Sequence, residues 1–265
     1  MTGNALFAFL VTLFAGLSTG IGSLIAFFAN KTNTKLLSFS LGLSAGVMIY
    51  ISFMEMLPNS INLLSGVYNE NGTWYAVLAF FAGMLISLII DKLVPEKENP
   101  HEVRFVESMN SDIDKSKLHR VGVMTAIAIA IHNFPEGIAT FITAYSDADL
   151  GIPVAIAVAI HNIPEGIAVA VPIYYATGNK KKAMKFSFFS GLAEPLGALL
   201  AFLLIMPFIN DTVLGVIFSV VAGIMVFISF DELLPGAQKY GNHHLPTYGV
   251  VMGMAIMAFS LLLLG

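Results

Sequence analysis

The sequence predicts an all-α integral membrane protein, with eight transmembrane helices in a 3+2+3 arrangement that contains an inverted repeat. Three observations lead to this prediction. Of the 265 residues, 57% are hydrophobic and 11% are charged, which is far too apolar for a soluble domain of this size. The apolar residues gather into windows long enough to cross a bilayer. The basic residues fall only in alternate connections between those windows.

A helix that crosses the hydrocarbon core needs about 20 mostly apolar residues. Eight such windows run approximately over residues 4–29, 36–57, 74–93, 121–144, 152–175, 183–206, 213–234 and 247–264. The first has no basic segment before it and is longer than the apolar part of a signal peptide, so we expect it to be retained. The windows make residues 1–265 a single transmembrane domain. Its longest connection, residues 94–120, is charged and is expected to be a solvated linker.

The charges of the connections predict the orientation, because lysine and arginine near helix ends stay on the cytoplasmic side. All the basic residues flank the connections after the first, third, fifth and seventh windows: Lys31, Lys35, Lys92, Lys97, Arg104, Lys115, Lys117, Arg120, Lys180, Lys181, Lys182, Lys185 and Lys239. The opposite connections carry only acidic residues, namely Glu70, Asp147, Asp149 and Asp211. We therefore expect both termini outside and the 94–120 loop inside.

The second and seventh windows contain similar sequences. Residues 45–58 read AGVMIYISFMEMLP and residues 222–235 read AGIMVFISFDELLP, which are identical at 9 of 14 positions. The two windows cross the membrane in opposite directions. Such an inverted repeat is typical of secondary transporters with a site near the midplane. It places three helices on each side of a central pair, with the pseudo-two-fold axis between windows four and five.

The central pair carries a second duplication. Residues 126–139 read AIAIAIHNFPEGIA and residues 155–168 read AIAVAIHNIPEGIA, identical at 12 of 14 positions. The proline in each copy lacks an N–H and frees a backbone carbonyl. Residues four apart share a helix face. Each copy therefore presents a histidine and a glutamate beside an asparagine: His132, Glu136 and Asn133, then His161, Glu165 and Asn162.

These carboxylates need a counter-charge. An ionisable group at the bilayer centre costs about 2.5 to 3.5 kcal/mol, and Glu194 in the sixth window adds a third carboxylate. One or two divalent cations would compensate. The chain has no cysteine, so nitrogen and oxygen ligands favour zinc, ferrous iron, manganese or cobalt. The alternative is that the polar groups only join helices by hydrogen bonds, which a duplicated motif makes less attractive.

Further carboxylates lie nearer the membrane surfaces. Glu55 is near the outer end of window two, and Asp231 and Glu232 are near the inner end of window seven. Because Glu55 and Glu232 are equivalent in the repeat, we hypothesise that they attract the ion at the two mouths of one pathway. The alternative is that they are interfacial carboxylates that reach water. Met48 could donate a thioether ligand, although packing is the commoner role of methionine.

At HNFPEG (132–137) and HNIPEG (161–166) the sequence resembles the ZIP family (Zrt-, Irt-like proteins) of divalent metal transporters. The resemblance extends over essentially the whole chain. It implies uptake of divalent metal into the cytoplasm through a binuclear centre at the midplane, bridged by Glu136 and Glu165. The implied ligands are His132, Asn133, Glu136, His161, Asn162, Glu165 and Glu194.

The resemblance also implies the substrate and the setting. Zn²⁺ or Fe²⁺ would be a transported substrate and not a cofactor, with manganese, cobalt and cadmium as further candidates. The protein would be a homodimer in the lipid bilayer of the plasma membrane, the inner membrane of a bacterium.

The rival function is a membrane-embedded metal-dependent hydrolase, with a metal-activated water, or a di-metal oxidase. Paired helices that carry histidine and carboxylate would serve either. The sequence has no HExxH with a third ligand, and ferritin-like proteins place glutamate three residues before histidine instead of histidine four before glutamate. No nucleotide-binding motif is present, and we expect neither a nucleotide nor a nucleic acid as a partner. Transport is therefore favoured over an enzyme.

Overall fold

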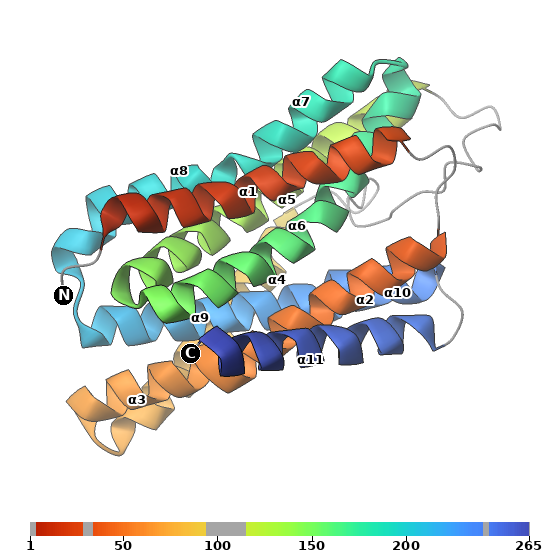
Figure 1. Ribbon diagram of the computed structural model, residues 1–265. Helices are drawn as coiled ribbons and strands as arrows, with labels where there is room; N and C mark the ends of the chain where they lie inside the picture. Colours follow the sequence, from red (N-terminus) through yellow and green to blue (C-terminus); the bar gives the residue numbers. More distant parts are fainter. Residues whose placement is uncertain (1–3, 29–33, 94–114, 241–243, 265) are drawn as a thin grey trace.

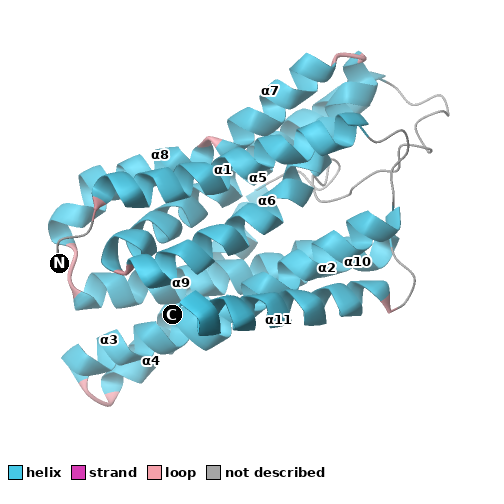
Figure 2. Cartoon of the chain, viewed as in Figure 1, coloured by secondary structure: helices cyan, strands magenta, loops and turns pink. Residues whose placement is uncertain are grey.

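The computed structural model describes residues 4–28, 34–93, 115–240 and 244–264. All regular structure within these ranges is helical, and none of it is strand (Figure 2). The all-α prediction is confirmed. Most of the predicted 94–120 loop, residues 94–114, lies outside the described residues.

The helices join end to end into rods (Figure 1). In chain order these are α1 (Ala5–Phe28); α2 (Thr34–Ile51) with the π turn η1 (Ser52–Met56) and α3 (Leu57–Tyr68); α4 (Asn71–Leu93); α5 (Lys115–Ser146); α6 (Ala148–Thr177); α7 (Lys180–Gly191) with α8 (Ala193–Leu200), η4 (Ala201–Ile205) and η5 (Met206–Phe208); α9 (Asp211–Ile228) with the π turn η6 (Ser229–Leu233) and α10 (Leu234–Tyr240); and α11 (Leu245–Leu264).

Seven of these rods contain a stretch long and apolar enough to cross a membrane. The remaining rod, α5, holds the predicted window 121–144, and several of its side chains lie outside the described part. An eighth span therefore stays a prediction.

The second rod differs most from its predicted window, which ended at residue 57. The helix continues to Tyr68, because Pro58 occupies the first turn of α3, where the missing N–H is not needed. Packing stabilises the extension. Leu64 and Ser60 are buried, and the Ser60 hydroxyl donates to the Gly215 carbonyl of α9 at 2.6 Å.

The π turns η1 and η6 fall at equivalent positions of the 45–58 and 222–235 repeat, on SFMEM and SFDEL. Each contains the repeated glutamate, Glu55 or Glu232, and each precedes Leu-Pro. A π turn holds one more residue than an α-helical turn and is frequent at functional sites. The sequence repeat therefore corresponds to a repeated irregularity of the helix.

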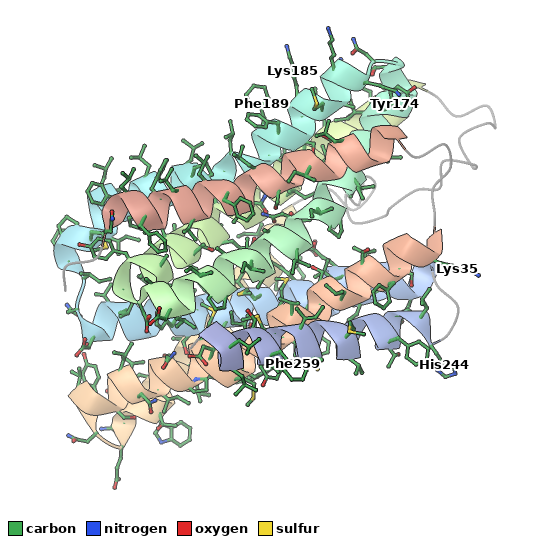
Figure 3. The ribbon with its side chains drawn as sticks, viewed as in Figure 1. Lys35, Tyr174, Lys185, Phe189, His244 and Phe259 are labelled. Carbon is green, nitrogen blue, oxygen red and sulfur yellow. The ribbon has the colours of Figure 1, made fainter. Side chains whose placement is uncertain are left out.

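The rods run back and forth along one direction (Figure 1). The junctions α3–α4, α5–α6 and η5–α9 lie at one end, which we call the Ser146 end. The α6–α7 junction, the end of α10 and the start of α11 lie at the other, the Lys180 end. Lys35, Tyr174 and His244 lie at this second end in Figure 3, with Lys185 a little further along α7.

The basic residues at the described helix ends lie at one of these two ends only, whereas acidic residues occur at both, since Asp91 adjoins Lys92. The acidic residues Glu70, Asp147, Asp149 and Asp211 adjoin the junctions of the Ser146 end. The basic residues Lys35, Lys92, Lys180 and Lys182 adjoin the Lys180 end. This placement of the basic residues is the one that the sequence predicted.

Four helix pairs pack at very short range: α1 on α6, α5 on α8, α2 on α11 and α4 on α9. In each pair, both helices place a glycine where a Cβ atom would overlap a backbone carbonyl of the partner. These glycines are Gly22 and Gly166, Gly137 and Gly197, Gly46 and Gly253, and Gly83 and Gly223. Small residues that let backbones approach are typical of helix packing in membranes.

The outside of the bundle is apolar. Phe189 and Phe259 are each 64% exposed and Leu262 is 79% exposed, and Figure 3 shows the two phenylalanines pointing away from the helices. Soluble monomers rarely expose so much apolar surface. The exposed face therefore suits contact with lipid.

Replacing Gly223 with alanine tests the close packing of α4 and α9. The added methyl group would overlap the Phe80 carbonyl, and we expect the free energy of unfolding to fall by about 1 to 3 kcal/mol. The control is Gly66→Ala in α3, where nothing lies within 4 Å of the added atom and helix propensity favours alanine by about 1 kcal/mol. Thermal unfolding of the purified proteins in detergent measures both, and equal effects would contradict this packing.

Candidate metal centre

The two HNxPEG motifs lie inside α5 and α6, and both helices continue through the motif proline. Asn133, Glu136, His161, Asn162 and Glu165 are all buried, with Glu136 at 2% and Glu165 at 8% exposure. The side chain of His132 lies outside the described part. The structure therefore brings five of the six motif residues into the interior of the bundle.

The two motifs hold each other's carboxylates. His161 Nε2 on α6 lies 3.0 Å from Glu136 Oε2 on α5, within hydrogen-bond distance. Asn133 on α5, with its amide nitrogen turned toward α6, donates to Glu165 Oε2 at 3.2 Å. His161 Nδ1 also lies 3.9 Å from Glu165 Oε1 on its own helix. His161 thus stands between both glutamates, and the two motifs form one cluster.

Asn162 connects this cluster to two other helices. Its amide nitrogen donates to the Ala15 carbonyl of α1 at 2.9 Å and also to Glu194 Oε1 of α8. Glu194 is fully buried. The third carboxylate predicted from the sequence therefore lies beside the motifs, joined to them through Asn162.

Glu194 is positioned by a break in the sixth predicted window. Helix α7 ends at Gly191 and α8 begins at Ala193, which places Glu194 in the first turn of the new helix, just before Pro195. A carboxylate is favoured in the first turn because the helix dipole is positive there. The window was predicted as one continuous helix, and this interruption is a correction of that prediction. Proline lacks the N–H that a continuous helix needs.

The glycines that follow the two glutamates allow the close approach of α8 and α1. A Cβ on Gly137 would overlap the backbone of Glu194, and a Cβ on Gly166 would overlap the Thr19 carbonyl. The glycine of each HNxPEG motif therefore brings a neighbouring helix against the carboxylate beside it. Sequence reasoning assigned no role to these glycines, although their repetition in both copies was the available signal.

Several oxygen atoms of the cluster remain available to a cation. Within the described residues, Glu136 Oε1, Asn162 Oδ1 and Glu194 Oε2 have no hydrogen-bond partner. An unsatisfied buried polar atom costs about 1 to 3 kcal/mol. Glu136, Glu165 and Glu194 are buried together in this cluster, and like charges that share a site repel one another. Both the unused lone pairs and the repulsion would be compensated by a bound divalent cation.

No three His, Asp or Glu side chains of the described residues already form a cage around one point. The geometry above explains this, because the groups are joined in pairs by hydrogen bonds. A cation would have to replace contacts such as that between His161 and Glu136. The arrangement is a set of neighbouring polar side chains, and in the described residues three of the acidic or histidine groups do not meet at one point.

The candidate pathway residues lie around this cluster in different ways. Glu55 is half-buried and accepts a hydrogen bond from Asn59 Nδ2 at 3.1 Å. Glu232 is half-buried, whereas Asp231 is exposed. Met48 is buried within the hydrophobic core, which suits packing.

Comparison with known proteins identifies a family. A family model described as ZIP Zinc transporter matches residues 2–112 and 95–261. Three bacterial proteins, each named Zinc transporter ZupT, are similar over nearly their whole length. The protein of Lysinibacillus sphaericus is 60% identical and that of Streptococcus mutans is 60% identical, covering 100% and 99% of both chains respectively. That of Clostridium perfringens is 57% identical over 98% of this chain and 96% of its own.

Replacing Glu194 with glutamine tests the role of the third carboxylate. Glutamine keeps an oxygen that accepts from Asn162 but removes the negative charge. We expect the thermal stability of the metal-free protein to be unchanged or higher, because a buried charge is removed. Zinc affinity, measured by titration of the purified protein, should fall at least about tenfold, the loss seen even for groups that only support a ligand.

Glu70→Gln on the exposed α3–α4 connection is the control and should leave zinc affinity unchanged. Equal zinc affinity of Glu194→Gln and the unaltered protein would remove Glu194 from the centre.

Proposed function

Because the chain belongs to the ZIP family of zinc transporters, we propose that it takes up divalent metal ions, zinc first among them, through the cluster of α5, α6 and α8. The observation that carries the proposal is the set of buried glutamates, histidine and asparagines in the middle of an apolar bundle. The family is one of transporters and not of enzymes. The hydrolase or oxidase alternative is therefore not favoured.

We propose that the chain crosses the membrane eight times, as three helices, a central pair and three helices. The short-range helix pairs support this arrangement. In an inverted repeat the pseudo-two-fold axis makes pairs of rods equivalent. The equivalent pairs would be α1 and α7–α8, the second rod and the seventh, α4 and α11, and α5 and α6. The α1–α6 contact would then be equivalent to the α5–α8 contact, and the α2–α11 contact to the α4–α9 contact. All four contacts are among the closest of the bundle.

We propose that the Lys180 end faces the cytoplasm of a bacterial cell and that both termini face outward. The support is the placement of the basic residues at the described helix ends, which lie at one end of the bundle only, together with the tendency of basic residues to stay inside. Ions would then enter from the Ser146 end and leave at the Lys180 end. The membrane would be the plasma membrane.

We propose a binuclear centre with His132, Asn133, Glu136, His161, Asn162, Glu165 and Glu194 as ligands. Glu136 and Glu165 would bridge the two ions, since each is held by a residue of the opposite motif. Three buried carboxylates in one cluster, Glu136, Glu165 and Glu194, suit more than one divalent cation. The nitrogen and oxygen ligands admit iron, manganese, cobalt and cadmium as further substrates.

Glu55 and Glu232 would attract ions at the two sides of the centre, with Asp231 at the inner mouth. The π turns that hold both glutamates support this, because such turns are common at functional sites. We also propose a homodimer. The helices α4 and α11 have the least buried spans of the described bundle, and their free faces could meet a second copy.

Purified protein in sealed lipid vesicles should accumulate zinc with time. Glu136→Ala and Glu165→Ala should abolish accumulation, because each removes a bridging carboxylate, while Glu70→Ala on the exposed α3–α4 connection should leave it unchanged. A fluorescent zinc indicator inside the vesicles measures uptake. Vesicles of the unaltered protein that bind zinc without accumulating it would contradict the transport proposal.

Glu55→Ala and Glu232→Ala should slow zinc uptake severalfold at low zinc concentration and much less at saturating zinc, because charges at a mouth raise the local ion concentration. High salt should weaken the difference for the same reason. Initial rates over a range of zinc concentrations measure the difference in uptake between each variant and the unaltered protein. Either residue is excluded from the pathway if its variant takes up zinc as fast as the unaltered protein at every concentration.

A further inference from the structure

Two threonines follow Glu136 on the same face of α5. Thr140 is four residues and Thr143 seven residues beyond the glutamate, so all three side chains share one face of the helix. Thr140 is 0% and Thr143 is 1% exposed. Neither hydroxyl oxygen has a hydrogen-bond partner among the described residues. Two hydroxyls without a hydrogen-bond partner in the described part therefore lie along α5 between Glu136 and the Ser146 end.

Buried threonines in helices usually satisfy their hydroxyl locally, by donating to the carbonyl of the residue four positions earlier. The buried Thr12 does so to the Ala8 carbonyl at 2.9 Å, and the partly buried Thr177 does so to the Ile173 carbonyl at 2.7 Å. Thr140 and Thr143 do not, although the same kind of acceptor is present in α5. A buried hydroxyl without a partner destabilises the fold, so hydrogen bonding within the described bundle does not explain these two hydroxyls.

The second copy of the motif lacks these hydroxyls. After the shared GIA, α5 continues as TFIT (140–143) and α6 as VAVP (169–172). The residue equivalent to Thr140 is Val169, which is also fully buried. Since α5 and α6 are antiparallel, the threonines lie between Glu136 and the Ser146 end, whereas Val169 lies between Glu165 and the Lys180 end. Within the α5–α6 pair the unpartnered hydroxyls thus occur on one side of the cluster, although the buried hydroxyls of Thr19 in α1 and Ser44 in α2 also lack a partner in the described part.

The outer repeat has the same asymmetry. Ser52 in η1 is fully buried with no partner for its hydroxyl within the described part. Its equivalent, Ser229 in η6, donates to the Met225 carbonyl at 2.8 Å. Ser52 belongs to the rod that continues to the Ser146 end, and Ser229 to the rod that continues to the Lys180 end. Within the described residues, Ser52 therefore lacks a partner where its repeat equivalent has one, and α5 differs from α6 in that its buried threonine hydroxyls stand where α6 has no hydroxyl.

We propose that Thr140 and Thr143 are transient ligands of the transported ion, and that their hydroxyl oxygens replace water molecules of a partly hydrated divalent cation on its way from the Ser146 end to Glu136. The inference rests on the proposed transport function. A hydroxyl oxygen offers lone pairs but no charge, so it binds a cation weakly. Weak binding at successive positions lets an ion both enter and leave, whereas a further carboxylate would trap it.

Valine replacements test the proposal, because they remove the hydroxyl and keep the branched shape. The double variant Thr140→Val/Thr143→Val should lower the initial rate of zinc uptake into vesicles about tenfold. A fall of this size corresponds to losing one weak contact that stabilises the moving ion at the top of the barrier. Its thermal stability should be equal or higher, since unsatisfied hydroxyls are replaced by apolar groups. Zinc affinity of the centre should stay unchanged.

Serine replacements at both positions keep the hydroxyls and should retain most of the uptake rate. The control Thr177→Val removes a hydroxyl that bonds its own helix and should leave uptake unchanged. The proposal is overturned if the double valine variant transports at the normal rate, or if it loses stability and uptake together. If the unaltered protein binds zinc but does not accumulate it, the transport function is wrong and this inference fails with it.

Discussion

The structure depends on one constraint, which is that two glutamates must face each other inside an apolar bundle. Each is held by a polar residue of the opposite helix: His161 contacts Glu136, and Asn133 donates to Glu165. The two contacts use different residues of the repeated motif, a histidine of α6 and an asparagine of α5, and both cross between the helices. Each carboxylate thus has a hydrogen-bonding partner on the other helix. Separating α5 from α6 would leave both groups buried and unsatisfied, so these helices stay together.

The glycines extend this constraint to the rest of the bundle. Gly137 and Gly166 let α8 and α1 approach until backbone meets backbone. At that distance Asn162 reaches both the Ala15 carbonyl and Glu194. The same motif therefore provides both the polar side chains and the glycine that lets the neighbouring helix approach them. Close packing and polar chemistry are two results of one short sequence.

Much of this arrangement could be predicted from the sequence because it is periodic. The spacing of His161 and Glu165 places them on one face, and apolar windows mark the helices. The structure shows what periodicity cannot. His161 is closer to Glu136 on the other helix than to Glu165 on its own. The extension of the second rod past Pro58 depends on contacts with α9 that no local pattern contains, whereas Pro195 was a local signal for the break after Gly191.

The π turns η1 and η6 have a consequence for the length of their rods. One residue advances an α-helix by about 100°, so the extra residue in each π turn rotates everything that follows relative to what precedes it. Ala45 and Ser60 therefore pack correctly only if the residue count between them is conserved. A deletion of one residue there would turn the buried face of α3 away from α9 while leaving composition and hydropathy almost unchanged. In these two rods, insertions and deletions are constrained more strictly than substitutions.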